Sequence, residues 1–154
     1  MDYLTLKWIH ILSATVLLGT GAGIAFFMWM AHLTRCPRTI AATARVVVIA
    51  DTIFTAPAVV VQLLSGLWLT QLLHLPLSTF WVQTALILFF VVGACWLPVV
   101  WLQARARNLA RQAVKENTDL SPAYYRTMRI WFWLGWPAFI SVIVIFWLMV
   151  HKPL

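Results

Sequence analysis

Four long apolar stretches alternate with short polar segments along this chain of 154 residues. They cover approximately residues 3–33, 44–73, 79–103 and 129–150. Each stretch is longer than the about 20 residues that an α-helix needs to cross the hydrocarbon core of a bilayer. The pattern predicts four transmembrane helices, and the first two are long enough to tilt or to extend beyond the lipid.

Proline marks the breaks between these stretches, because it is favoured in turns and at the first position of a helix. Pro37, Pro76 and Pro122 stand at the three breaks. The first two connections are short, so neighbouring helices should run antiparallel. The sequence therefore predicts one all-α integral membrane domain over residues 1–154, an up-down-up-down bundle of four helices. The helices should kink where proline falls inside a span, at Pro57, Pro98 and Pro137.

Composition supports the membrane assignment and limits the function. The chain is 63% hydrophobic and only 10% charged, whereas a soluble domain carries roughly 25% charged residues. The net charge of +7 could suggest a nucleic-acid partner, but so apolar a chain has no surface left for a soluble DNA-binding domain. We therefore expect no nucleic acid among its partners.

The positive charges are distributed unevenly along the chain. The first and third loops hold nine cations, while only Lys7 and Lys152 lie near the termini. Loops rich in Lys and Arg stay in the cytoplasm, so we expect loops one and three to be cytoplasmic and both termini to lie outside a bacterial inner membrane. The nine cations are Arg35, Arg38, Arg45, Arg105, Arg107, Arg111, Lys115, Arg126 and Arg129.

Residues 104–121 are predicted to form a basic cytoplasmic extension of the third helix followed by a loop. Arg107, Arg111 and Lys115 recur at every fourth position, and Arg105 lies nearby. A solvated helix end attracted to anionic lipid headgroups explains this spacing, and a specific lipid or an acidic partner is the alternative.

Asp51 is the only carboxylate inside a predicted span. A charge within a span costs several kcal/mol on insertion scales, so its side chain should face the bundle interior. At 100° per residue, Asp51, Thr55, Gln62 and Ser65 fall within about 80° of one another and form a polar stripe. The stripe either joins helices by hydrogen bonds or handles a proton or a solute.

Two tryptophans are expected at a similar depth to Asp51, namely Trp96 on the third helix and Trp136 on the fourth. An indole N–H is a donor without a partner in lipid. We expect one of them to donate a hydrogen bond to the Asp51 carboxyl group.

His10 is the second candidate site, about two turns into the first helix. A histidine within the membrane is a frequent haem or metal ligand. His32 is on the same helix but about 33 Å further along it, so the two cannot ligate one metal. His10 is therefore either an axial ligand, with haem b as the cofactor, or a hydrogen-bonded residue between helices.

Gly19 and Gly23 form a GxxxG motif in the middle of the first helix. Such motifs allow two helices to approach closely. We expect this pair to support helix packing within one chain or between chains, and hence a homo-oligomer (a dimer or trimer) or an accessory subunit of another membrane protein.

Several segments carry a resemblance to a known family. LKWIHILSATVLLGTGAG at Leu6–Gly23, the segment Ala44–Leu69, WLPVVWLQ at Trp96–Gln103 and the ending WFWLGWPAF…LMVHKP resemble the small bacterial membrane proteins of domain-of-unknown-function family 2269. The resemblance spans nearly the whole chain and implies a four-helix membrane protein without assigning an activity.

A more distant likeness is to HemJ-type protoporphyrinogen oxidases and CopD-like membrane proteins. His10 in KWIH matches the early histidine of those proteins, which implies b-type haem at His10. HemJ-type proteins also carry a functional lysine in a later helix, and the third helix here has none within the lipid. The likeness therefore implies haem binding through His10, while the missing lysine counts against porphyrinogen oxidation without excluding it.

Two functions follow from these observations. The first is a haem-binding redox or accessory subunit that uses His10. The second is a cofactor-free module, either structural or for transport of a small solute, that uses the polar stripe at Asp51. An enzyme acting on a lipid-soluble substrate has the least support.

Overall fold

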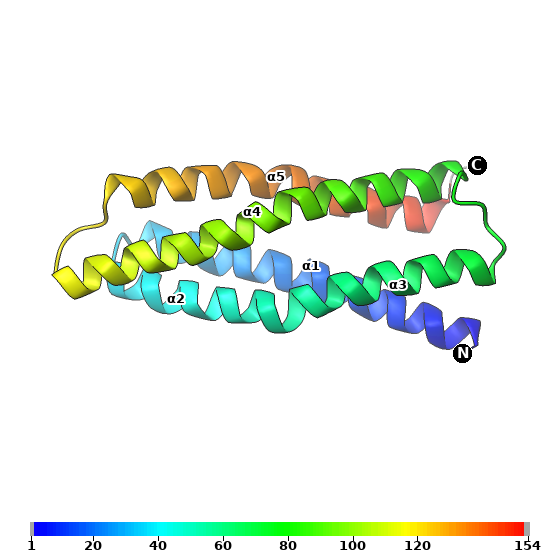
Figure 1. The fold of residues 1–154 in the computed structure, drawn as a ribbon, viewed down its shortest axis with the longest axis horizontal. Coiled ribbons are helices and arrows are strands. Elements are labelled where there is room, and N and C mark those ends of the chain that lie inside the picture. The colour runs from blue at the N-terminus through cyan, green and yellow to red at the C-terminus, as the bar shows by residue number, and fades with distance from the viewer. Residues whose placement is uncertain (1, 153–154) are drawn as a thin grey trace.

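The structure, a computed structural model, describes residues 2–152 as a bundle of long helices (Figure 1). In chain order they are α1 (Tyr3–Leu33), α2 (Pro37–Ala50), the π-helical turn η1 (Asp51–Thr55), α3 (Ala56–Leu72), α4 (Phe80–Glu116) and α5 (Pro122–His151). Because α2, η1 and α3 follow one another without a break, the chain forms four long rods, each apolar enough to cross a membrane. The expected all-α four-helix membrane bundle is confirmed.

The rods begin and end close to the predicted limits, with two extensions. The second rod starts at Pro37 rather than residue 44, because proline suits the first turn of a helix and Cys36 supplies the extended residue before it. The fourth rod starts at Pro122 rather than residue 129, where the Ser121 side chain accepts a hydrogen bond from the Tyr124 N–H. Both extensions are polar segments, so their helical structure could not be predicted from apolarity alone.

The bend expected at Pro57 takes the form of the π-helical turn η1. Proline lacks an N–H and its ring collides with the carbonyl group four residues earlier. The widened turn just before it relieves this collision, and the Ala56 N–H donates to the Asp51 carbonyl five residues back. The rod changes direction here, between α2 and α3 (Figure 1). Pro98 and Pro137 lie inside α4 and α5, which remain α-helical, so kinks there stay predictions.

The main core lies at one end of the bundle, beside loops 34–36 and 117–121, which we call the closed end. Thirteen buried residues pack together there. Ala44, Ala106 and Ala110 are 0% exposed, and such small side chains let helix backbones approach closely. The core residues are Met28, Ala31, Ile40, Ala44, Val47, Leu102, Ala106, Ala110, Ala113, Leu120, Tyr124, Met128 and Trp131.

Aromatic contacts fasten α1 to α5 at the closed end. The Tyr124 side chain is 0% exposed, and a hydrogen bond of 3.1 Å joins its Oη to Nδ1 of His32. Deeper in the bundle, Trp29 packs against Phe132, with their ring centroids 4.8 Å apart. These contacts close the bundle where α1 and α5 would otherwise separate.

The basic extension of α4 corrects a sequence expectation. The helix does continue to Glu116, but it is not a freely solvated end. Ala106, Ala110 and Ala113 form a buried face in the closed-end core, while Arg111 and Lys115 are exposed. The spacing of the alanines, at intervals of four and three residues, was the sequence signal for this seam.

The opposite end, which holds both termini and the loop between α3 and α4, is the open end (Figure 1). Here α1 packs on α3 and α4 packs on α5, but within residues 2–152 neither α1 and α5 nor α3 and α4 pack along each other. Each pair has its own few buried residues. For α1 and α3 these are Leu6, Ser13, Ala58 and Ser65, and for α4 and α5 they are Val82, Ala85, Ser141 and Leu148.

Candidate functional site

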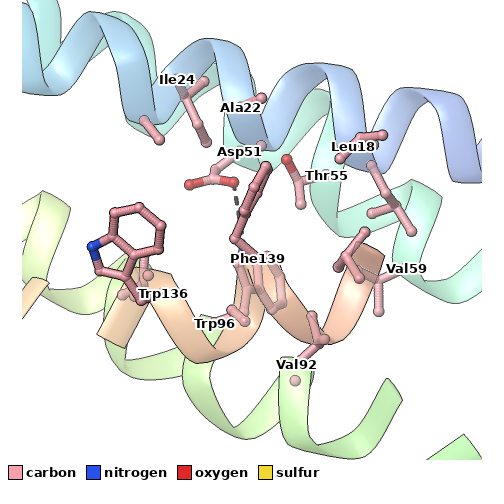
Figure 2. Close-up of a pocket in the computed structure, with 18 of the residues that line it drawn as sticks. Leu18, Ala22, Ile24, Asp51, Thr55, Val59, Val92, Trp96, Trp136 and Phe139 are labelled. Carbon is pink, nitrogen blue, oxygen red and sulfur yellow. Dashed lines mark hydrogen bonds between the residues drawn. The ribbon is translucent and has the colours of Figure 1, made fainter. Parts of the chain in front are cut away.

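A cavity of about 480 Å³ lies between the two pairs of rods, where they diverge from the closed end. All four rods contribute to its lining (Figure 2). Of the six polar-site residues expected from the sequence, five line this cavity, and Ser65 does not. The five are Asp51, Thr55, Gln62, Trp96 and Trp136.

Asp51 lies in the first position of η1 and its side chain is only 1% exposed. The Trp96 Nε1–H donates a hydrogen bond of 3.3 Å to its Oδ1 (Figure 2). Trp136 also borders the cavity, but it is 49% exposed and its indole nitrogen points away from the carboxyl group (Figure 2). The expectation that one of the two indoles bonds Asp51 is confirmed for Trp96.

Four buried polar atoms have no hydrogen-bond partner within residues 2–152, and all four belong to residues that line this cavity. They are Asp51 Oδ2, Thr55 Oγ1, Gln103 Oε1 and Trp131 Nε1. Thr55 and Gln103 both approach the Asp51 carboxyl group, but neither these two oxygens nor Asp51 Oδ2 meets hydrogen-bond geometry. Nearly all buried polar groups in folded proteins have a partner. The polar end of the cavity is therefore suited to a group from outside the chain.

Gln103 and Trp131 are site residues that sequence reasoning missed. Gln103 is the last residue of the third apolar stretch, and Trp131 lies near the start of the fourth. Both lie in the part of their apolar stretch that is nearer to the closed end, and so does Asp51. Matching depth was thus the sequence signal, but only the packing shows that the side chains are 1% and 6% exposed and face one cavity.

The remaining walls are apolar, with aliphatic, small and aromatic residues. Among the described residues no Lys or Arg lines the cavity, so Asp51 has no cationic side chain in the lining. The aromatic residues of the lining are Trp29, Phe89, Trp96, Trp131, Phe132, Trp136, Phe139 and Phe146.

His10 lies outside the cavity, in a network between α1 and α3 that shares Gln62 with the cavity lining. The Gln62 amide Nε2 donates to its Nε2 at 3.1 Å, so Nδ1 carries the proton and donates to Ser65 Oγ at 2.9 Å. The Ser13 hydroxyl donates to Gln62 Oε1. Both ring nitrogens therefore have protein partners, and the residues around His10 do not fit a haem. Its geometry is that of a hydrogen-bonded residue between helices.

Gly66 makes room for the His10 ring, and sequence reasoning did not find it. A Cβ atom at Gly66 would lie 3.1 Å from His10 Cε1. Any larger residue would press on a ring that Ser65 and Gln62 hold on both sides. The small residue is thus required by the approach of α1 to α3.

Gly19 and Gly23 do not serve packing within the chain. No described atom of another helix lies within 4 Å of where their Cβ atoms would be. The motif was expected to support packing either within one chain or between chains. These glycines do not provide the packing within one chain. Contact with a second chain stays a prediction.

The basic residues of α4 lie at the closed end. The Arg105 guanidinium stands over the Trp101 ring, 5.2 Å from its centroid, and the Arg107 Nε–H donates to Asn108 Oδ1 at 3.2 Å. Arg111 and the remaining cation of the set, Lys115, are exposed. A tryptophan with an arginine over its ring is typical of the boundary between lipid tails and headgroups.

Comparison with known proteins identifies the family but no activity. The chain belongs to the family described as "Predicted integral membrane protein (DUF2269)", which matches residues 4–153. Comparisons with curated proteins and with solved structures found no match. The chain is therefore an integral membrane protein, while the likeness to HemJ-type and CopD-like proteins stays a prediction.

Proposed function

We propose that this DUF2269 protein is a cofactor-free binding module for a small lipid-soluble solute, as in the binding step of transport. The solute would occupy the cavity and place its polar group at Asp51. One observation carries the proposal: the four partnerless polar atoms all belong to residues of the same cavity.

The dimensions and chemistry of the cavity support this function. Ligand sites are typically concave, about 300–1,000 Å³ in volume, and mostly apolar with a few converging polar groups. The cavity of about 480 Å³ has these properties. Because the rods on either side do not pack along each other at the open end, a solute dissolved in the bilayer could enter from the side.

A purely structural role would leave a different arrangement. Polar residues that join membrane helices pair with one another, as His10, Gln62 and Ser65 do here. Asp51 is more deeply buried than His10 and Gln62, yet only one of its two oxygens is bonded. The contrast between these two networks favours solute binding at Asp51.

Binding of tritiated dodecanol to the protein in phosphatidylcholine nanodiscs tests the proposal. We expect a saturable component above the uptake by empty nanodiscs. Gly93 lines the cavity and has open space around its Cβ position, so Gly93→Leu should fill the cavity and weaken binding at least tenfold. The neighbouring Ala94→Leu is the matched control, because Ala94 is exposed and lies outside the lining. Equal binding by both variants would contradict the proposed site.

Haem binding at His10 remains the other prediction from the sequence. It would require the ring to give up its bond to Gln62 or to Ser65. A Soret band in protein purified from haem-replete cells, lost in His10→Ala, would support it. A colourless preparation would exclude it.

We further propose that the closed end faces the cytoplasm of a bacterial inner membrane, because nine of the eleven Lys and Arg residues lie in its loops and helix ends. Cys36 can report this. Hydrogen bonds from Thr39 lower the pKa of its exposed thiol, which favours the reactive thiolate. In a Cys95→Ser background, an impermeant maleimide should label Cys36 only in inverted membrane vesicles. Labelling in intact spheroplasts would reverse the orientation.

The same charges suggest anionic headgroups as the lipid partner of the closed end. Replacing Arg105, Arg107, Arg111 and Lys115 by Gln should reduce co-purification of phosphatidylglycerol, measured by mass spectrometry. Unchanged lipid recovery would argue against it.

A homo-oligomer through the open face of Gly19 and Gly23 is also proposed. Gly19→Leu should reduce chemical crosslinking between chains in membranes. Crosslinking at the unchanged level would place any interface elsewhere.

A further inference from the structure

We infer that the solute bound at Asp51 is a lipid-soluble primary amine, recognised through its ammonium group. This inference rests on the proposed function, and it adds the chemical class of the ligand. Its support comes from the number of partnerless oxygens, from the charge of the cavity and from its walls.

The oxygens match the donors of an ammonium group. Asp51 Oδ2, Thr55 Oγ1 and Gln103 Oε1 each lack a partner, and Thr55 and Gln103 both approach the Asp51 carboxyl group. A primary ammonium carries three N–H donors and no acceptor, whereas a hydroxyl group carries one donor. An ammonium group therefore offers as many donors as these three residues have partnerless oxygens, and one alcohol offers fewer.

The charge of the cavity also favours an ammonium group. Asp51 contributes its only carboxyl group, and among residues 2–152 no Lys or Arg side chain lines the cavity to balance it. A buried carboxylate without a cation is strongly unfavourable, and a paired one much less so. A cationic ligand supplies the charge that the chain itself does not place there.

The aromatic walls suit a cation with an apolar tail. Trp96 and Phe139 lie beside Asp51 in the cavity (Figure 2). Aromatic faces attract ammonium groups by about 0.5–2 kcal/mol, depending on desolvation. The rest of the lining is apolar and would hold a hydrocarbon tail.

Trp131 refines the ligand further. Its buried Nε1–H is a donor without a partner, so it requires an acceptor that an ammonium group does not have. An oxygen close to the nitrogen would meet it. A long-chain amino alcohol would thus satisfy all four partnerless atoms, and a simple long-chain amine three of them.

The test compares three probes with the same tail, tritiated dodecylamine, dodecanol and dodecyltrimethylammonium, in phosphatidylcholine nanodiscs. We expect dodecylamine to bind at least tenfold more tightly than the other two, because only it offers both the charge and three N–H donors. Asp51→Asn, which keeps the shape of the side chain and removes its charge, should weaken dodecylamine at least tenfold and remove its preference over dodecanol. Thr52→Val is the control, since Thr52 is exposed and bonds only within its helix.

The outcomes separate the inference from the proposed function. Equal affinity for dodecylamine and dodecanol would overturn the inference and leave the binding function standing. Equal affinity for the trimethylammonium probe would show that charge alone matters and would overturn the primary-amine assignment. No saturable binding of any probe would overturn both. Should Asp51→Asn fail to fold, Gln103→Leu provides the second variant, with the same loss of preference for dodecylamine expected.

Discussion

The two ends of this bundle pack differently, and the more apolar end is the less tightly packed one. At the closed end α2 contacts α4 through alanines that are 0% exposed, and a core of thirteen residues joins all four rods. At the open end the rods remain as two separate pairs. The cavity begins where the shared core of the closed end gives way to the two separate pairs of rods.

The difference teaches that apolarity does not decide packing in a membrane. Lipid tails are as apolar as leucine, so helices gain nothing by hiding leucine from them, and close approach depends on small residues and polar contacts. The closed end has Ala44, Ala106 and Ala110 on facing helices. Across the cavity the facing residues include bulky rings such as Trp136 and Phe139, which hold the rods apart.

The largest expected effect comes from breaking the closed end. In Ala106→Leu the added side chain has no space beside α2 and α5, so we expect the free energy of unfolding to fall by about 1–3 kcal/mol. Gly93→Leu at the open end meets no atom within 4 Å of its Cβ position and should cost far less. Unfolding from mixed micelles by SDS measures both, and equal losses would contradict the distinction between the two ends.

A smaller effect is expected from removing a hydrogen bond that joins α1 to α5 at the closed end. Tyr124→Phe removes the hydroxyl bonded to His32, and we expect a loss of about 1 kcal/mol in the free energy of unfolding. Tyr125→Phe is the matched control, since Tyr125 is 40% exposed and its change should be close to zero. If the two variants unfold alike in the same assay, the bond between Tyr124 and His32 does not stabilise the closed end.

The smallest effect is expected between α1 and α3. Gly66→Ala should displace His10 and weaken its two hydrogen bonds, each worth about 0.5–1.5 kcal/mol. Alanine regains up to about 1 kcal/mol as a better helix former, so we expect a net loss of about 0.5 kcal/mol. Gly19→Ala, with open space around it, should instead be neutral or stabilising. A gain in stability for Gly66→Ala equal to that for Gly19→Ala would show that the His10 network is loose.

Part of the candidate site could be predicted from the sequence. A lone carboxylate in a span must face the bundle interior because of its desolvation cost. This led to Asp51, its stripe and two candidate indoles, of which Trp96 donates the bond. The assignment of Ser65 to the same site was incomplete, since Ser65 instead bonds His10. Residues of one polar stripe can face two different neighbouring helices. A helical projection does not show which neighbour each residue faces.

Gln103, Trp131 and Gly66 could not be assigned in the same way. Each is unremarkable in sequence, and each acquires its role from a residue far away along the chain: the first two through the cavity they share with Asp51, the third through the ring of His10. Such roles depend on how helices are rotated and how deep they lie relative to one another.

The sequence by itself determined the membrane environment, the number of spanning helices and most of their limits, because these depend on local apolarity, charge and proline. The tertiary structure decided which end of the bundle closes, that a π-helical turn beginning at Asp51 precedes Pro57, and that four partnerless polar atoms belong to residues lining one cavity. The physical reason is that burial in lipid acts on each helix separately, whereas packing and hydrogen bonding act only between helices that have already met.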